Sequence, residues 1–290
     1  MATGATHGER QRPSFSLKER LEARSLATPF KAKLAAVYVL ITIVLLLLFA
    51  YFEFDTAFMA EWLPYIAGGV PLTLIICVGG IILATALAVF GALGRLSKNP
   101  LAQGVANFYV SFIRGTPLLV QIFFVYFALP QLAFKEQTPT FLQPFLVYDI
   151  TFAAILALGV NYGAYMSEIF RAGIQSVGYG QIEAAHALGM SAGQTTRRVV
   201  LPQAVRNIIP PTGNEFIAML KDSSLVGLAG ATELFYRAQS TGKAESRAYE
   251  TLAVAALIYW GLTSIFSFFQ KRLENKMGRG YVRELASHGH

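Results

Sequence analysis

The stretch EAAHALGMSAGQTTRRVVLP, residues 183–202, is a polar segment between two long apolar runs. Its first six residues are good helix formers, and Gly189 stands where a left-handed residue ends a helix at little steric cost. Ser191 and Gln194 match a capping box that begins a second helix, and Pro202 opens or kinks the apolar segment that follows. The sequence therefore predicts a helix, a glycine corner and a second helix, all exposed to water.

The first of these helices has one shallow face. Ala184, Ala187 and Leu188 share this face by their spacing of three and four residues, and small side chains let another surface come close. Glu183, near the helix start, offers a negative charge to a basic partner. Taken alone, such a loop helix is more simply a connection that lies against its own bundle. The alternative is a docking element for a second protein.

The composition around this segment is that of a membrane protein. Of 290 residues, 54% are hydrophobic and only 14% are charged, and the mean hydropathy is +0.47. Soluble domains carry about one quarter charged residues, and a bilayer core requires about 20 mostly apolar residues per helix. We therefore predict an all-α membrane protein with six transmembrane helices, at residues 34–52, 64–93, 105–131, 150–171, 204–229 and 249–269.

The basic residues orient these helices. With the amino terminus inside, eighteen of the 24 Lys and Arg residues fall on the cytoplasmic side, and only Lys135, Arg237, Lys243 and Arg247 fall outside. This asymmetry predicts cytoplasmic termini and a cytoplasmic position for residues 183–202. The net charge of +7 is then explained by topology and anionic lipid, so nucleic acid is not expected as a partner.

The ends of the chain follow from the same reasoning. Residues 1–33 are too long and too mixed in charge for the start of a secretory signal, so they are predicted to form a cytoplasmic arm before a retained helix at 34–52. Residues 276–290 are predicted to form a cytoplasmic tail. The segments that are predicted to be external lie around 53–63, 132–149 and 230–248.

The spacing within residues 183–202 is also that of a known signature. It reads Glu-Ala-Ala, three residues, Gly, nine residues, an aliphatic residue, one more, and Leu-Pro. The residues that match it are Glu183, Ala184, Ala185, Gly189, Val199, Leu201 and Pro202. The pattern resembles the cytoplasmic EAA loop of permease subunits in binding-protein-dependent ATP-binding-cassette (ABC) importers, with Val199 where isoleucine is usual.

Other stretches resemble the polar amino acid branch of that family. They are SFIRGTPLLVQIFFVYF (111–127), GAYMSEIFRAGI (163–174), LPQAVRNIIPPTGNEFIAMLKDSSLV (201–226) and, more weakly, GVPLTL (69–74). The resemblance covers about residues 64–275. It implies the five-helix transmembrane core of a type I ABC importer permease, to which the helix at 34–52 is an addition.

The resemblance implies partners as well. Residues 178–200 would form a coupling loop that lodges in a groove of a cytoplasmic ABC ATPase dimer. The residues assigned to this coupling are Glu183, Ala184, Ala185, Gly189, Arg197 and Pro202. A second permease subunit, identical or homologous, would complete the path, and an external solute-binding protein would meet the loop at 231–248. The substrate would be an amino acid, and the location a bacterial inner membrane.

The expected energy source is a separate subunit. No GxxxxGK[ST] phosphate-binding loop is present, and TGKA at 241–244 lacks both the upstream glycine and the hydroxyl residue. We therefore expect a non-catalytic transport subunit that binds no cofactor or metal itself, with ATP and Mg²⁺ on the partner ATPase. An ion-coupled carrier or channel for small polar solutes, and a membrane scaffold, remain as alternatives.

The fourth predicted helix carries a polar stripe. Asn161, Tyr165, Glu168 and Arg171 follow one another at steps of four, three and three, so they share one face, and Glu168 can pair with Arg171. Such a stripe either satisfies itself against neighbouring helices or forms a wall of the translocation path.

The fifth predicted helix is the most polar. Pro210 and Pro211 remove backbone donors beside Gly213, so nearby carbonyls are expected to turn towards a wet cavity. Its polar candidates are Asn214, Glu215, Lys221 and Asp222. They serve either a gate held by ion pairs or direct contact with the substrate. Arg114 is expected deep in the bilayer if the third helix begins near residue 105, or at the cytoplasmic interface if that helix begins after Thr116 and Pro117. Its role is then either snorkelling or a phosphate contact, or that of a structural hinge.

Overall fold

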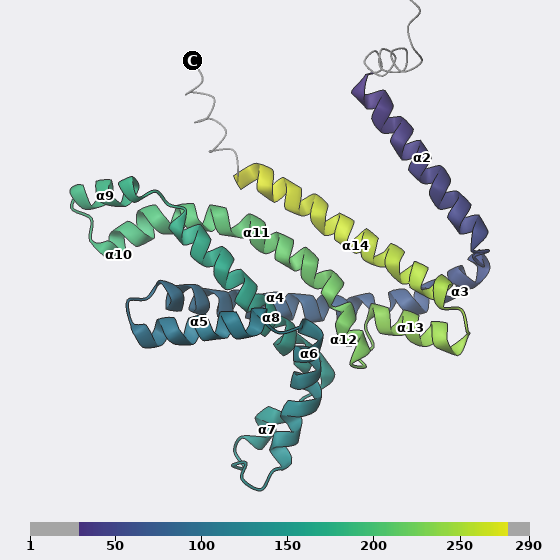
Figure 1. Ribbon diagram of the computed structural model, residues 1–290, viewed down its shortest axis with the longest axis horizontal. Helices are drawn as coiled ribbons and strands as arrows, with labels where there is room; N and C mark the ends of the chain where they lie inside the picture. Colours follow the sequence, from purple (N-terminus) through teal and green to yellow (C-terminus); the bar gives the residue numbers. More distant parts are fainter. Residues whose placement is uncertain (1–28, 278–290) are drawn as a thin grey trace, which may run out of the picture. The chain divides into compact units, whose positions relative to one another are not determined.

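This computed structural model describes residues 29–277, and every regular element among them is a helix (Figure 1). Residues 1–28 of the predicted arm and 278–290 of the predicted tail lie outside the described residues. The chain divides after Asp55 into two compact units, each of which has its own internal contacts.

The first unit contains α2 (Phe30–Tyr51) and the short segment up to Asp55. After Lys33 the helix carries no charged side chain, and its 22 residues are long enough to cross a bilayer. The hydroxyl of Thr42 donates to the carbonyl oxygen of Tyr38 over 2.9 Å, so this polar group is satisfied within the helix. Helix α2 covers residues 34–51 of the span predicted at 34–52, and Phe52 is its C-cap.

The second unit begins with α3 (Thr56–Ala67) and α4 (Val70–Leu96), which are separated at Gly68 and Gly69. The prediction of one helix from residue 64 is therefore wrong at its start. The reason is a close backbone approach: a Cβ atom on Gly69 would lie 2.5 Å from the backbone nitrogen of Leu234. Only a glycine lets the two chain segments pass this closely.

The segment predicted as one helix at 105–131 is broken in two. Helix α5 (Pro100–Arg114) is followed by α6 (Leu118–Phe123), a π-helical turn η1 (Phe124–Ala128) and a 3-10 turn η2 (Leu129–Phe134), which together run at 105° to α5. Pro117 explains the break, because the residue before a proline is driven out of the helical conformation. Helix α6 and the short α7 (Gln143–Leu146) consequently extend away from α5 (Figure 1).

Helix α8 (Ile150–Gln175) lies at the centre of this unit and packs along α4. Glycines on both helices allow a close approach. A Cβ on Gly91 of α4 would clash with the hydroxyl of Ser167, and a Cβ on Gly159 of α8 would lie 2.6 Å from the Leu83 side chain. Small residues are typical of membrane helix interfaces, where close packing drives association. The core around them includes Ile76, Ala84, Leu158, Met166 and Met219.

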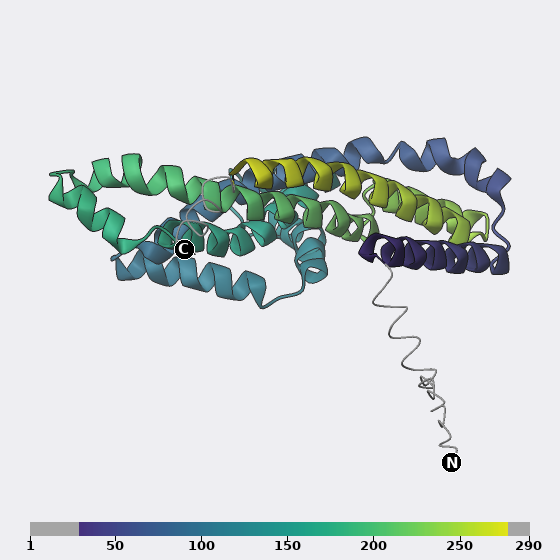
Figure 2. The same cartoon turned by 90° about the horizontal axis from the view of Figure 1, so that it is seen from above.

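Two short helices, α9 (Tyr179–Ala187) and α10 (Ala192–Thr195), form one end of the second unit (Figures 1 and 2). They lead through a π-helical turn, η3 (Thr196–Val200), into α11 (Leu201–Asp222) and α12 (Ser224–Leu228). Helical structure is unbroken from Ala192 to Asp222, and it includes both Pro210 and Pro211.

Helices α13 (Leu234–Ala244) and α14 (Ala248–Met277) run side by side and pack with α3 (Figures 1 and 2). Glu233 caps α13, because one of its carboxylate oxygens accepts from the Tyr236 backbone N–H over 2.8 Å. The other oxygen accepts from the Tyr259 hydroxyl of α14 over 2.7 Å. Burial raises the pKa of the Glu233 carboxyl above its usual value, although these hydrogen bonds act in the opposite direction.

Four of the described helices, α2, α4, α8 and α14, are long and apolar enough to cross a membrane, and the number is five if the bent segment from Pro100 to Phe134 is counted as one broken span. Helix α11, predicted as a span at 204–229, does not qualify by composition because polar and charged residues interrupt it. The all-helical membrane fold is thus confirmed, whereas the predicted count of six membrane helices is not.

Candidate functional site

Residues 179–200 form a compact corner that we call the elbow: α9, the turn at Gly189, α10 and η3. Gly189 has a φ angle of +79°, and the Met190 N–H donates back to the Ala185 carbonyl over 3.0 Å. Ser191 begins α10 with a full capping box, in which its backbone N–H donates to the Gln194 side chain over 2.9 Å. The predicted helix, glycine corner and capped second helix are therefore confirmed.

The elbow presents small side chains to its surroundings. Glu183 and Ala184 are exposed, Leu188 is 80% exposed, and Ala185 is the residue of α9 that turns inward. The Gln203 side chain of α11 donates a hydrogen bond to the Gln181 side chain of α9, which ties the two helices together. Each coupling residue predicted from sequence lies on the elbow or, for Pro202, in the adjoining first turn of α11.

Residues 189–193 also spell GxSxG, the pattern of the hydrolase nucleophile elbow. That motif requires a strand before the serine, and the described residues contain none. The Ser191 hydroxyl instead accepts from the Gln194 backbone N–H over 3.4 Å. The serine is a helix cap here, and the letter pattern carries no catalytic meaning.

A cluster of three arginines surrounds one carboxylate between α4, α5 and α8, and we call it the basic cluster. Glu168 Oε1 pairs with Arg95 and lies 3.5 Å from Arg114 Nη1, while Oε2 accepts from Arg171 Nε over 2.9 Å. The predicted pairing of Glu168 with Arg171 is therefore confirmed. Sequence spacing gave no sign of Arg95, because it reaches Glu168 from a helix 73 residues away.

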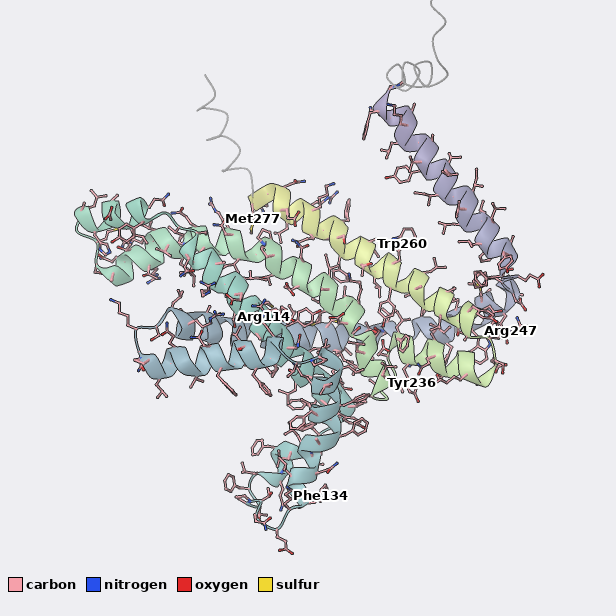
Figure 3. The ribbon with its side chains drawn as sticks, viewed as in Figure 1. Arg114, Phe134, Tyr236, Arg247, Trp260 and Met277 are labelled. Atoms are coloured by element: carbon pink, nitrogen blue, oxygen red, sulfur yellow. The ribbon has the colours of Figure 1, made fainter. Side chains whose placement is uncertain are left out.

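Arg114 is the last residue of α5 and stands at the break before α6 (Figure 3). Its guanidinium lies 5.1 Å from the centre of the Tyr165 ring, a cation–π arrangement. Gln121 holds the break, since its side-chain nitrogen donates to the Ile113 carbonyl over 2.8 Å and to the Thr116 hydroxyl over 2.7 Å. Arg114 therefore stands at the bend, and the next helix begins after Pro117, which is the second of the two helix starts considered from the sequence.

A first cavity, of about 460 Å³, opens beside this break. Arg114, Asn161, Glu215 and Asp222 line it, so four of the predicted path residues come together from α5, α8 and α11. The Tyr162 hydroxyl donates to Asp222 Oδ2 over 2.8 Å. The Asn161 amide donates to the Gln121 side chain over 3.0 Å. The wall is consequently polar and fixed by hydrogen bonds.

A second cavity, of about 550 Å³, adjoins the first. The two share Arg114, Gly115 and Tyr165, and the second adds Arg95 and Glu168. Polar side chains of Asn107 and Ser111 on α5 complete this wall. We call the two cavities together the passage; their polar lining extends from the acids of α11 to the basic cluster.

Two predicted path residues are not brought into this passage. Asn214 and Lys221 are exposed and line neither cavity. Tyr162 and Thr116, which sequence reasoning did not select, do line the first cavity. Neither residue belongs to the polar stripe of α8, which is recognised by its spacing, so their place in the cavity wall became visible only with the fold. Among the described residues, no group of three or more His, Cys, Asp or Glu side chains is placed to hold a metal ion.

Similarity to known proteins agrees with this architecture. Residues 80–279 match the family described as binding-protein-dependent transport system inner membrane component. The chain is 37% identical over 227 residues to a probable amino-acid permease protein, YxeN, of Bacillus subtilis (strain 168), covering 78% of this chain and 97% of that protein. It is 35% identical over 225 residues to the glutamine transport system permease protein GlnP of Escherichia coli (strain K12), covering 78% of this chain and 98% of that protein.

A solved structure supports the same assignment. The crystal structure of an amino acid ABC transporter with histidines matches with a TM-score of 0.68 and 34% identity, over 77% of this chain and 99% of that chain. The family match covers more than half of the present sequence and includes the elbow, the passage and α14. The chain therefore belongs to the family of binding-protein-dependent transport system inner membrane components.

Proposed function

We propose that this chain is the permease subunit of an ATP-driven, binding-protein-dependent importer of polar amino acids. In this proposal the chain forms the translocation path and binds a separate cytoplasmic ATPase dimer through the elbow. A second permease subunit completes the path, an external solute-binding protein delivers the amino acid, and ATP and Mg²⁺ are bound by the ATPase. Both chain termini are cytoplasmic, and the protein resides in a bacterial inner membrane, with lipid around its helices.

One observation carries the proposal: the elbow and the passage are connected by uninterrupted helix. The elbow presents exposed Glu183, Ala184 and Leu188 at one end, and α11 places Glu215 and Asp222 in the first cavity at the other. A partner that moves the elbow therefore moves one wall of the passage. Together with Arg114 of α5, the acids of α11 give the first cavity groups for both ends of an amino acid.

The central test is ATP-dependent uptake by the complex with its ATPase and binding protein in proteoliposomes. We expect Glu183→Lys to leave the protein inserted but to remove the binding of the ATPase or the coupling of hydrolysis to uptake. Gly193→Ala is the matched control, because an added Cβ there meets nothing within 4 Å and the site is on the same elbow. Normal uptake by Glu183→Lys would contradict docking at the elbow. Uptake that an ionophore abolishes without any ATPase would favour an ion-coupled carrier instead.

Membrane orientation has a separate test. Cys77 is the one cysteine of the chain and is buried, so it offers little background for single cysteines introduced at exposed Gly180 on the elbow and exposed Lys243 on α13. In intact cells, an impermeant maleimide should label Lys243→Cys and should reach Gly180→Cys only after lysis. Labelling of the elbow from outside would overturn the proposed topology.

A further inference from the structure

Glu233 is the most deeply buried acidic residue of the described chain, with 0% of its surface exposed. No lysine, arginine or histidine of the described residues forms an ion pair with it. Burying a carboxyl group without a cation costs free energy. A helix cap alone does not require this cost, because the shorter Ser, Thr, Asp and Asn are the preferred caps. The longer glutamate side chain therefore serves more than the first turn of α13.

The carboxyl group of Glu233 contacts four helices. It accepts from the Tyr236 N–H of α13 and from the Tyr259 hydroxyl of α14, and the Thr73 hydroxyl of α4 donates to its Oε2 over 3.3 Å. Its Oε1 occupies the space beside Gly227 of α12, where an added Cβ would lie 2.4 Å from this oxygen. Hydrogen bonds are directional, so this one group fixes the position of α13 relative to α4, α12 and α14.

Tyr259 extends these contacts to the passage. Its hydroxyl lies within interaction range of the Ser223 hydroxyl, and Ser223 is fully buried and is the C-cap of α11. The preceding residue, Asp222, lines the first cavity and accepts from the Tyr162 hydroxyl over 2.8 Å. Three side chains therefore connect the first turn of α13 with the end of α11. We call Glu233, Tyr259 and Ser223 the buried relay.

The other end of α13 is open to a partner. Lys243 and Ala244 at its carboxyl end and the following Glu245 are exposed, whereas Leu234 and Ala238 are buried. In the proposed orientation the exposed end faces outward, where the solute-binding protein would meet residues 231–248. The helix has 11 residues and is about 16 Å long. A displacement of its exposed end consequently moves its capped end as well.

We propose that the buried relay transmits docking of the solute-binding protein on α13 to the passage, with Glu233 and Tyr259 as positioning residues. This inference rests on the proposed function and adds a route of regulation from the outer face. Docking displaces α13, the carboxyl group of Glu233 carries Tyr259 with it, and Ser223 passes the movement to Asp222 in the cavity wall. The passage is then acted on through both ends of α11, by the ATPase at the elbow and by the binding protein at Ser223.

Removal of one hydroxyl from the relay tests this route. The complex with its ATPase is placed in nanodiscs, and ATP hydrolysis is measured with and without the binding protein, which is preloaded with a mixture of the twenty standard L-amino acids. Tyr259→Phe keeps the aromatic ring but loses the hydrogen bond to Glu233. We expect its basal rate and its affinity for the binding protein to be unchanged. Stimulation of hydrolysis by the binding protein should fall at least about twofold, the lower end for residues that carry coupling.

Thr263→Val is the matched control. Its hydroxyl lies one turn further along α14 and, among the described residues, donates only to the carbonyl oxygens of Tyr259 and Trp260 in the same helix. Its loss breaks no contact of the relay, so the variant should be stimulated like the unchanged protein.

Glu233→Gln provides a second variant. It keeps one acceptor oxygen for the cap of α13, but its amide nitrogen cannot accept from the Tyr259 and Thr73 hydroxyls. It should therefore lose stimulation too. Combined with Tyr259→Phe it should have little additional effect, because both changes break the same link.

Normal stimulation of Tyr259→Phe would overturn the inference, as would an equal loss in Thr263→Val. Weaker binding of the binding protein to Tyr259→Phe would also overturn it, since the relay would then shape the docking surface and not transmit its occupation. A proportional fall of basal and stimulated rates would show a general loss of stability and would count against the inference equally. If Tyr259→Phe does not assemble with the ATPase, Glu233→Gln decides by the same measurements. An unchanged complex that the binding protein neither binds nor stimulates would contradict the proposed function itself, before any variant is made.

Discussion

The side-chain nitrogen of Gln270 in α14 donates a hydrogen bond to the carbonyl oxygen of Pro210 in α11 over 2.6 Å. Gly213, one turn further along α11, leaves the space that the Gln270 side chain occupies. Two prolines weaken the hydrogen-bond ladder of α11 at this point. Gln270 supplies a substitute from a neighbouring helix, as polar side chains do inside membranes.

Gly213→Ala should therefore destabilise the protein, because the added Cβ would clash with the Gln270 side chain and displace it from Pro210. We expect a loss of about 1–3 kcal/mol in the free energy of unfolding, measured as a lower Tm of the purified protein in detergent. Gly261→Ala on α14 is the control, since nothing lies within 4 Å of its added Cβ. Equal Tm values for the two variants would show that the contact is not important for stability.

The left-handed turn of the elbow predicts a second effect. Gly189 and Gly193 both have open space where a Cβ would be added, but only Gly189 has a positive φ, at +79°. Gly189→Ala should strain the backbone by about 1 kcal/mol and shift the elbow, so ATP-dependent uptake should fall while insertion is unchanged. Gly193→Ala should transport normally. A normal uptake rate in both variants would mean that the turn tolerates the strain without moving the docking surface.

Buried Glu233 predicts a dependence of stability on pH. Because burial raises the pKa of this carboxyl, the folded protein binds the proton more tightly than the unfolded chain. Its stabilising contribution is then complete below the ordinary glutamate pKa of about 4.3 and is lost as the pH rises through the higher folded value. In Glu233→Gln this loss should disappear.

Tm measured against pH for both proteins checks this expectation. The Tm of the unchanged protein minus that of Glu233→Gln should decrease with rising pH and then level off. Exposed Glu245, at the other end of α13, provides the control substitution to Gln. A difference that is constant across the pH range would exclude Glu233 as the responsible group.

The interface of α4 and α8 predicts a packing effect. Gly91→Ala would place a Cβ against the Ser167 hydroxyl, which is itself buried and donates to the Gly163 carbonyl over 2.7 Å. We expect a loss of about 1–3 kcal/mol in the free energy of unfolding and a lower Tm. Gly104→Ala on α5 has open space and should have no such effect. If the Tm of Gly91→Ala equalled that of Gly104→Ala, the interface between α4 and α8 would accommodate an added methyl group, contrary to this prediction.

The structure of the elbow could be predicted from the sequence because the interactions that form it are local. A glycine with a positive φ and a capping box at Ser191 each depend on neighbours within four residues. The same is true of the pair formed by Glu168 and Arg171, which are three residues apart on one helix. The composition likewise indicated an all-helical membrane protein.

Only some of the residues that line the passage could be predicted from the sequence, because the contacts between them join segments that are distant along the chain. The side chains of Arg95 and Tyr162 bind partners that come from other helices, and nothing in the local sequence indicates those partners. The bend at Pro117 was one of two positions considered for the start of the third helix, and the choice is fixed by Gln121, whose hydrogen bonds reach back across the break. The sequence analysis also counted α11 as a span, although Glu215 and Asp222 line the first cavity and other polar residues interrupt the helix, so the number of membrane crossings could not follow from apolar length alone.

The unbroken helix from Ala192 to Asp222 is about 45 Å long at 1.5 Å per residue. In the proposed function it would act as a lever, with the ATPase bound at the elbow end and Asp222 at the other end. A tilt of a few degrees at the elbow end would move the Asp222 end by several ångströms, which is comparable to the reach of a hydrogen bond. A small movement of the ATPase subunit would thus be enough to make or break a hydrogen bond between Asp222 and a small charged substrate.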